Sequence, residues 1–197
     1  MISVCITGGV GSGKSVVCKI FRQFHVPVYE ADVEAKKLYE SEPEISERIK
    51  KEISEDVFDK KGKPDRKKLF SLVFGDESFL KKLNKIVHPF VLCHFSEWKK
   101  HYSSSPYVIM ESAILFESTT DKDCDKVITV SAPLELRIQR TMQRDKRTRE
   151  EVELIIKKQW SDEEKEKRSD FIIVNDEIQL VIPQVIEIHN CIISFTK

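Results

Sequence analysis

The chain has 197 residues, and 33 Lys and Arg balance 33 Asp and Glu, so its formal net charge at pH 7 is zero although 34% of its residues are charged. This balance argues against a nucleic-acid-binding or membrane-surface protein, and the length suits one α/β core with a modest insertion. No stretch approaches the ~18 consecutive apolar residues of a membrane helix, and no basic leader precedes the first apolar run, so we expect no membrane insertion and no export.

The five cysteines are scattered along the chain, and the two closest, Cys5 and Cys18, are 13 positions apart. This spacing fits neither a disulfide framework nor a zinc site. It predicts a protein of the reducing cytoplasm.

Short apolar runs alternate with segments of helical periodicity. Residues 2–7 form a β-branched run that ends at a glycine-rich loop, and the apolar positions after the loop recur at helical spacing. Further strands are expected over residues 26–32, 107–111, 126–130 and 171–174. Strands that are apolar on both faces and separated by helices predict a parallel sheet covered on both sides.

The long segment between the second and third predicted strands, residues 33–106, contains no convincing strand and is typical of a helical insertion domain. Its helices are joined by the turn DKKGKP at residues 59–64. Pro89 is expected to mark a kink or a junction between two helices, because proline cannot supply a helical N–H.

Two capping boxes occur later in the chain. Thr148 and Ser161 each stand three residues before a Glu, which predicts two short helices after residue 148. The almost wholly charged run 162–168 is most simply interpreted as a solvated helix face.

The strongest chemical signal is TGGVGSGKS, residues 7–15, which matches the phosphate-binding loop in full and lies between a predicted strand and a predicted helix. Its glycines let backbone N–H groups converge on phosphate oxygens, and the helix adds its positive dipole end. Lys14 is expected to reach the β- and γ-phosphates, and the Ser15 hydroxyl to hold Mg²⁺. The residues predicted to contact ATP in this loop are Gly11, Ser12, Gly13, Lys14, Ser15 and Val16.

The surroundings of the loop distinguish the classes of nucleotide enzyme. A GTPase should carry an Asn-Lys-x-Asp element, but LNKI at residues 83–86 lacks the Asp. A motor or chaperone ATPase usually ends its third strand with Asp, whereas this chain has Glu111. A small-molecule kinase remains, favoured by a carboxylate after the second strand, a helical insertion and a later arginine-rich segment.

Asp32 is the carboxylate after the second predicted strand, at the sheet edge where ligands bind. It is placed to face the γ-phosphate, where it can accept the proton of an attacking hydroxyl or support Mg²⁺ through water. A helix N-cap is the other interpretation, and the two roles are compatible.

The arginine-rich segment spans residues 137–149. Arg137, Arg140 and Arg144 share one face of a helix and can clamp phosphates bidentately. On spacing alone, a solvated basic face or a nucleic-acid contact is an equal alternative. The position in the chain favours the clamp.

Six motifs, in this order, resemble those of dephospho-CoA kinases: TGGVGSGKS, EAD, LNKIVHP, LFE, RTMQRD and SDFIIVND. These enzymes use ATP to phosphorylate the ribose 3′-hydroxyl of dephospho-CoA, the last step of coenzyme A biosynthesis. The resemblance implies a P-loop kinase fold, a three-layer αβα arrangement with a five-stranded parallel sheet. It implies a nucleotide-binding core of residues 1–32, 107–136 and 151–197, a helical CoA domain of residues 33–106 and a lid of residues 137–150.

The resemblance also implies site residues and partners. Asp32 matches the proposed catalytic base, Arg140 and Arg144 match lid arginines, and Asn175 matches a residue near the adenine. His88 matches the family's His-Pro position but is assigned no chemistry. The expected substrates are ATP and dephospho-CoA, with Mg²⁺ as cofactor, in a cytoplasmic monomer.

Five positions depart from the family pattern. Glu30 and Glu111 stand where Asp is common, Ala113 replaces Pro, Val16 replaces Thr, and Glu177 stands where Gly is frequent. We expect activity to be retained, with the adenine pocket and the acceptor side altered. A different small-molecule or nucleoside monophosphate kinase, and a non-catalytic nucleotide-binding protein, are the alternatives.

Overall fold

The structure is a computed structural model that describes residues 1–59, 64–65, 68–69, 72 and 77–196. The chain divides into two compact units, one of Met1–Glu30 with Tyr102–Lys197 and one of Ala31–His101. The second unit overlaps the predicted insertion, whose boundaries stay a prediction.

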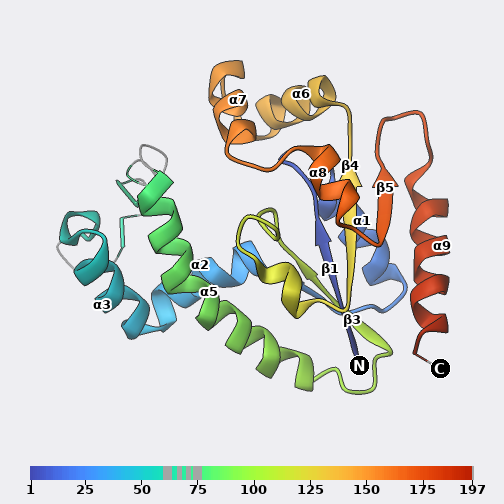
Figure 1. The fold of residues 1–197 in the computed structure, drawn as a ribbon, viewed down its shortest axis with the longest axis horizontal. Coiled ribbons are helices and arrows are strands. Elements are labelled where there is room, and N and C mark those ends of the chain that lie inside the picture. Colours follow the sequence, from blue (N-terminus) through green and yellow to red (C-terminus); the bar gives the residue numbers. More distant parts are fainter. Residues whose placement is uncertain (60–63, 66–67, 70–71, 73–76, 197) are drawn as a thin grey trace. The chain divides into compact units, whose positions relative to one another are not determined.

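A five-stranded sheet forms the centre of the first unit (Figure 1). Its strands are β1 (Ile2–Thr7), β2 (Val28–Glu30), β3 (Tyr107–Glu111), β4 (Lys126–Ser131) and β5 (Phe171–Val174). They lie in the order β2-β3-β1-β4-β5, and every pairing is parallel. The predicted parallel sheet is therefore confirmed, and the end of β1 lies between β3 and β4, where such sheets bind ligands.

Helices cover both faces of this sheet. The helices of the first unit are α1 (Lys14–Gln23), α6 (Leu134–Asp145), α7 (Arg149–Lys157), α8 (Asp162–Lys167) and α9 (Val181–Ser194), with the 3₁₀ helix η2 (Thr120–Asp123). Figure 1 shows α1 and α9 beside each other, and their apolar residues, Phe21 and Val185 among them, share one buried core with Ile6 and Ile109. On the other face α8 packs on β4. The alternation of side chains along each strand produces these three layers.

The second unit is helical in its described residues. It contains α2 (Ala31–Ser41), α3 (Pro43–Glu52), the 3₁₀ helix η1 (Glu55–Val57) and α5 (Glu77–Lys100). Ile45, Ile49 and Ile86 are fully buried where α3 packs on α5. Pro89 lies inside α5, so the predicted junction between two helices is wrong. Positions 60–63 of the predicted turn lie outside the described residues. None of the described helices combines the length and apolarity of a membrane span.

Both predicted capping boxes are present. Thr148 accepts from the Glu151 amide at the start of α7, and Ser161 accepts from the Glu164 amide at the start of α8. The solvated-face prediction for residues 162–168 is wrong in part, because the Lys165 side chain in this run is completely buried. Its Nζ lies 3.0 Å from Oε1 of Glu117, a partner that helical periodicity cannot indicate.

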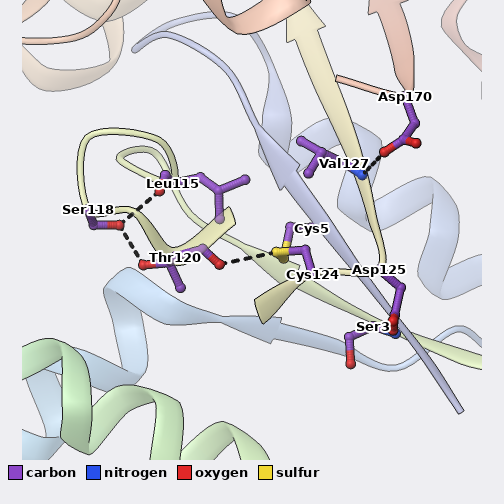
Figure 2. The surroundings of a disulfide bond; sticks show 9 residues. All are labelled: Ser3, Cys5, Leu115, Ser118, Thr120, Cys124, Asp125, Val127 and Asp170. Carbon is purple, nitrogen blue, oxygen red and sulfur yellow. Dashed lines mark hydrogen bonds between the residues drawn. A yellow bond between two sulfur atoms is a disulfide. The ribbon is translucent and has the colours of Figure 1, made fainter. Parts of the chain in front are cut away.

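One disulfide joins Cys5 of β1 to Cys124, 119 residues later, with 5.8 Å between their Cα atoms (Figure 2). The prediction that the cysteines form no disulfide framework is thus wrong for this pair. Parallel pairing of β1 with β4 brings the two residues together, and backbone contacts fix the approach, since Ser3 and Asp125 exchange hydrogen bonds beside it (Figure 2).

Candidate active site

The glycine-rich loop lies between β1 and α1, at the carboxyl edge of the sheet. Gly11 and Gly13 adopt left-handed φ values of 78° and 99°. A Cβ on Gly13 would lie 2.1 Å from Nδ2 of Asn175, and one on Gly11 would lie 2.3 Å from the Arg137 carbonyl oxygen. Both backbone conformation and close approach therefore require glycine here.

Helix α1 begins at Lys14 without a side-chain cap and without an acidic residue in its first turn. Its N-terminal N–H groups and its positive dipole end are therefore suited to an anion. Ser15 and Val16 are exposed in this first turn. The geometry is that of a phosphate site.

The Lys14 side chain is held against the loop. Its Nζ donates to the carbonyl oxygens of Gly8 at 2.9 Å and Gly9 at 3.2 Å, and the residue is only 8% exposed. The loop backbone thus positions an ammonium group beside the start of α1.

Two carboxylates end the neighbouring strands β2 and β3 at the same edge of the sheet. Glu30 of β2 and Glu111 of β3 are register partners, and Glu111 is also the register partner of Ile6. Burial raises the pKa of the Cys18 thiol to about 12, and the negative charge of Glu111 is the second cause of this shift. This edge of the sheet therefore carries oxygen ligands and negative charge close to α1.

Asp32 comes after β2, as predicted, but the helix N-cap interpretation is wrong. Helix α2 begins at Ala31, immediately after β2, so Asp32 lies in the first turn of that helix and belongs to the second unit. Its role opposite the γ-phosphate stays a prediction.

The three arginines of α6 have different partners. Arg140 donates to the Asn175 carbonyl oxygen at 3.2 Å and pairs with Glu177 at 3.0 Å. Arg144 is exposed and pairs with its neighbour Asp145. Arg137 is buried and donates to the Val10 carbonyl oxygen at 3.0 Å, so it is no part of an exposed clamp in this structure.

Asn175, predicted near an adenine, contacts the phosphate loop. Its Nδ2 donates to the Ser12 carbonyl oxygen at 2.8 Å. Glu177, two residues later, has a φ of 67° in the left-handed region that favours glycine.

Sequence reasoning missed two residues that hold the loop, one directly and one through Arg137. Gln159 accepts from the Val10 amide at 2.8 Å, and Asp162 pairs with Arg137. Asp162 belongs to the charged run after Ser161, and Gln159 belongs to no motif in the sequence.

Mg²⁺ prefers oxygen ligands and is commonly held by one or two side chains, waters and substrate phosphates. Ser15 offers an exposed hydroxyl in the first turn of α1, and Glu111 ends the strand next to β1. Across the described parts of the chain, no group of three or more His, Cys, Asp and Glu side chains is arranged as a metal site. The residues present fit a Mg²⁺ ion that arrives with a nucleotide.

A parallel sheet in this order, with the phosphate loop between β1 and α1 and arginines on α6, defines a P-loop kinase. The sequence matches the family described as dephospho-CoA kinase over residues 2–180. A dephospho-CoA kinase of Bacteroides fragilis is 40% identical over 187 residues, which cover 95% of this chain and 91% of the relative. The chain belongs to the dephospho-CoA kinase family.

Two solved structures are similar to this chain over almost its whole length. TT1252 from Thermus thermophilus has a TM-score of 0.83 and 31% identity, covering 100% of this chain and 98% of that one. The dephospho-CoA kinase from Campylobacter jejuni has a TM-score of 0.67 and 26% identity, covering 99% and 98%. The expected three-layer P-loop kinase fold is confirmed.

Proposed function

We propose that the protein transfers the γ-phosphoryl group of ATP to the ribose 3′-hydroxyl of dephospho-CoA, giving CoA and ADP. The observation that carries the proposal is the complete phosphate loop at the start of α1, in a chain whose family is dephospho-CoA kinase. The geometry of this chain supports the donor side of the site. The family supports the acceptor.

The loop and α1 bind the nucleotide phosphates in this proposal. The backbone N–H groups from Gly11 to Val16 point their dipoles at the phosphates, and Lys14 exchanges its contacts with the loop carbonyls for the β- and γ-phosphate oxygens. Phosphoryl transfer needs alignment and charge neutralisation above all, and these groups supply both.

Mg²⁺, when it is bound with ATP, would neutralise phosphate charge beside the Ser15 hydroxyl. Ser15 would hold the ion directly, and the Glu111 carboxylate would orient water around it.

The remaining roles fall to Asp32, Arg140, Arg144 and Asn175. Asp32 acts as the base that accepts the proton of the 3′-hydroxyl, and Arg140 stabilises the charge on the γ-phosphoryl oxygens. Arg144 contacts ATP from the lid, and Asn175 holds the loop near the adenine. The cytoplasmic location and the monomeric state stay predictions from the sequence.

The decisive experiment measures ADP release with ATP, Mg²⁺ and dephospho-CoA for the wild type and for Asp32→Asn. We expect the variant to lose about 10²- to 10⁴-fold in turnover, the usual effect of a positioned base. Asp123→Asn, which removes an exposed carboxylate from η2, is the matched control and should keep the full rate.

Two results would count against the proposal. A full rate in Asp32→Asn removes the base from the mechanism. Transfer to shikimate or to a nucleoside monophosphate, with dephospho-CoA left untouched, replaces the acceptor.

A further inference from the structure

We propose that Arg137, Gln159 and Asp162 are positioning residues that fix the backbone on both sides of Val10 and thereby set the shape of the phosphate loop before the nucleotide binds. This inference rests on the nucleotide-binding part of the proposed function. It is independent of which acceptor is phosphorylated.

The Arg137 side chain lies between the loop and α8. The residue is 4% exposed, its Nε donates to the Val10 carbonyl oxygen at 3.0 Å, and its Nη1 pairs with Asp162. A Cβ on Gly9 would lie 2.0 Å from Nη2, so the guanidinium is packed directly on the loop backbone. The Arg137 carbonyl oxygen and the Thr141 hydroxyl also approach Gly11 closely, at 2.3 and 2.6 Å from its ideal Cβ position.

Gln159, in the connection between α7 and α8, contacts the backbone N–H of the same residue, in the preceding peptide group. Its Oε1 accepts from the Val10 amide at 2.8 Å, and its Nε2 donates to the Ala113 carbonyl oxygen at 3.2 Å. Side chains from two separate segments thus occupy both backbone polar groups of Val10.

The segment that contains Gln159 is held in place by Glu117, which is itself paired with Lys165. The next residue, Trp160, donates its amide to Glu117 Oε1 at 2.8 Å, and the same oxygen lies 3.0 Å from the buried Lys165 ammonium. This accounts for the LFE motif, whose Glu117 supports the segment that holds the loop.

A buried ion pair is a poor device for stability alone, because apolar residues of similar volume stabilise a core as well or better. A loop with left-handed glycines is conformationally permissive, so ordering it during binding costs affinity. Holding Val10 in place before the nucleotide binds removes part of this ordering cost. The location of the pair beneath the loop is therefore explained by preorganisation rather than by core stability.

The test compares Arg137→Met, Asp162→Leu and the double variant by melting temperature and by the Kd for MgATP, measured by calorimetry without acceptor. Asp162→Leu leaves the buried Arg137 charge without its ion pair, Arg137→Met leaves the partly buried Asp162 without its ion pair, and each should lower the melting temperature. The double variant should recover most of the melting temperature, yet its Kd should stay about tenfold above the wild type, because the hydrogen bond to Val10 is still missing.

A Kd that returns to the wild-type value together with the melting temperature overturns the inference, since the pair would then be structural only. Lys126→Met, at the opposite end of β4, is the control for loss of a cation and should leave the Kd unchanged.

Gln159→Met decides the question if the double variant does not fold, because it removes the acceptor of the Val10 amide without creating a buried charge. We expect a Kd raised by about three- to tenfold with an almost unchanged melting temperature. Gln23→Met, exposed at the far end of α1, is its control.

An unchanged Kd in Gln159→Met overturns the inference. A wild type that binds no MgATP overturns both the inference and the proposed function. A wild type that binds MgATP but leaves dephospho-CoA untouched contradicts only the proposed acceptor.

Discussion

The Asn175 side chain donates its amide to the Ser12 carbonyl oxygen at 2.8 Å, which ties the end of β5 to a phosphate loop 163 residues earlier in the chain. Gly13 makes the contact possible, because a Cβ there would collide with the same amide at 2.1 Å. The end of β5 therefore takes part in shaping the loop.

Asn175→Asp should raise the KM for ATP by about tenfold in the ADP-release assay. The carboxylate cannot donate to the Ser12 carbonyl oxygen, and it places a negative charge beside the phosphates. Asn190→Asp makes the same substitution at an exposed position of α9 and should leave the KM unchanged. Equal values for the two variants would contradict a role for the contact in nucleotide binding.

Arg140→Ala should lower turnover by about 10²-fold, the effect of removing one donor that stabilises transition-state charge, while the Kd for MgATP changes less. Single-turnover rates and calorimetry separate the two effects. Glu177→Gln is the matched variant, since it breaks the ion pair seen here at 3.0 Å but keeps the arginine. If both variants lose turnover equally, the ion pair matters rather than a contact of Arg140 with the γ-phosphoryl group.

The strands and the phosphate loop were predictable from the sequence because their signals are local. Residues 107–110 and 171–174 are continuous apolar runs, and the predictions of strands over 107–111 and 171–174 have the bounds that the structure shows. β2 is shorter than predicted, because α2 begins immediately after Glu30.

The buried polar contacts were not predictable, because each partner comes from a distant segment. Helical spacing places Arg137 and Arg140 on one face, but it cannot tell whether that face meets solvent or the loop. Lys165 and Glu117 are separated by 48 positions, and the cysteines of the disulfide by 119. The parallel pairing of β1 with β4 and the packing of α8 on β4 bring segments distant in sequence together.

His189 should make the stability of the protein depend on pH. Its Nδ1 lies 2.6 Å from the Tyr107 hydroxyl, burial raises the pKa of Tyr107, and burial lowers the pKa of His189. The tyrosine therefore stays protonated and donates, and only a neutral imidazole can accept. Because the unfolded histidine binds a proton at higher pH than the folded one, stability is present above about pH 6.5 and falls as the pH decreases below it.

Urea unfolding at pH 7.5 and pH 5.5 tests this dependence for the wild type and His189→Gln. The wild type should lose more free energy of unfolding than the variant, whose amide oxygen accepts the same hydrogen bond at both pH values. The difference should stay below about 1 kcal/mol, because His189 is only partly buried. His101→Gln, at an exposed site, should behave like the wild type. If His189→Gln depends on pH as much as the wild type does, the assignment to His189 is contradicted.

Reduction of the Cys5–Cys124 disulfide should lower the free energy of unfolding by about 2–4 kcal/mol, because the bond closes a long loop in the unfolded chain. Urea unfolding with and without dithiothreitol measures the loss, and alkylation before reduction should leave these two thiols unlabelled. Cys124→Ser should be insensitive to dithiothreitol, whereas Cys191→Ser, which removes a free thiol, should keep the wild-type response. A wild type whose unfolding curve is identical under both conditions would mean that the bond contributes nothing to stability. The expected result places a cross-link of β1, the strand that leads into the phosphate loop, among the interactions that hold the nucleotide-binding core together.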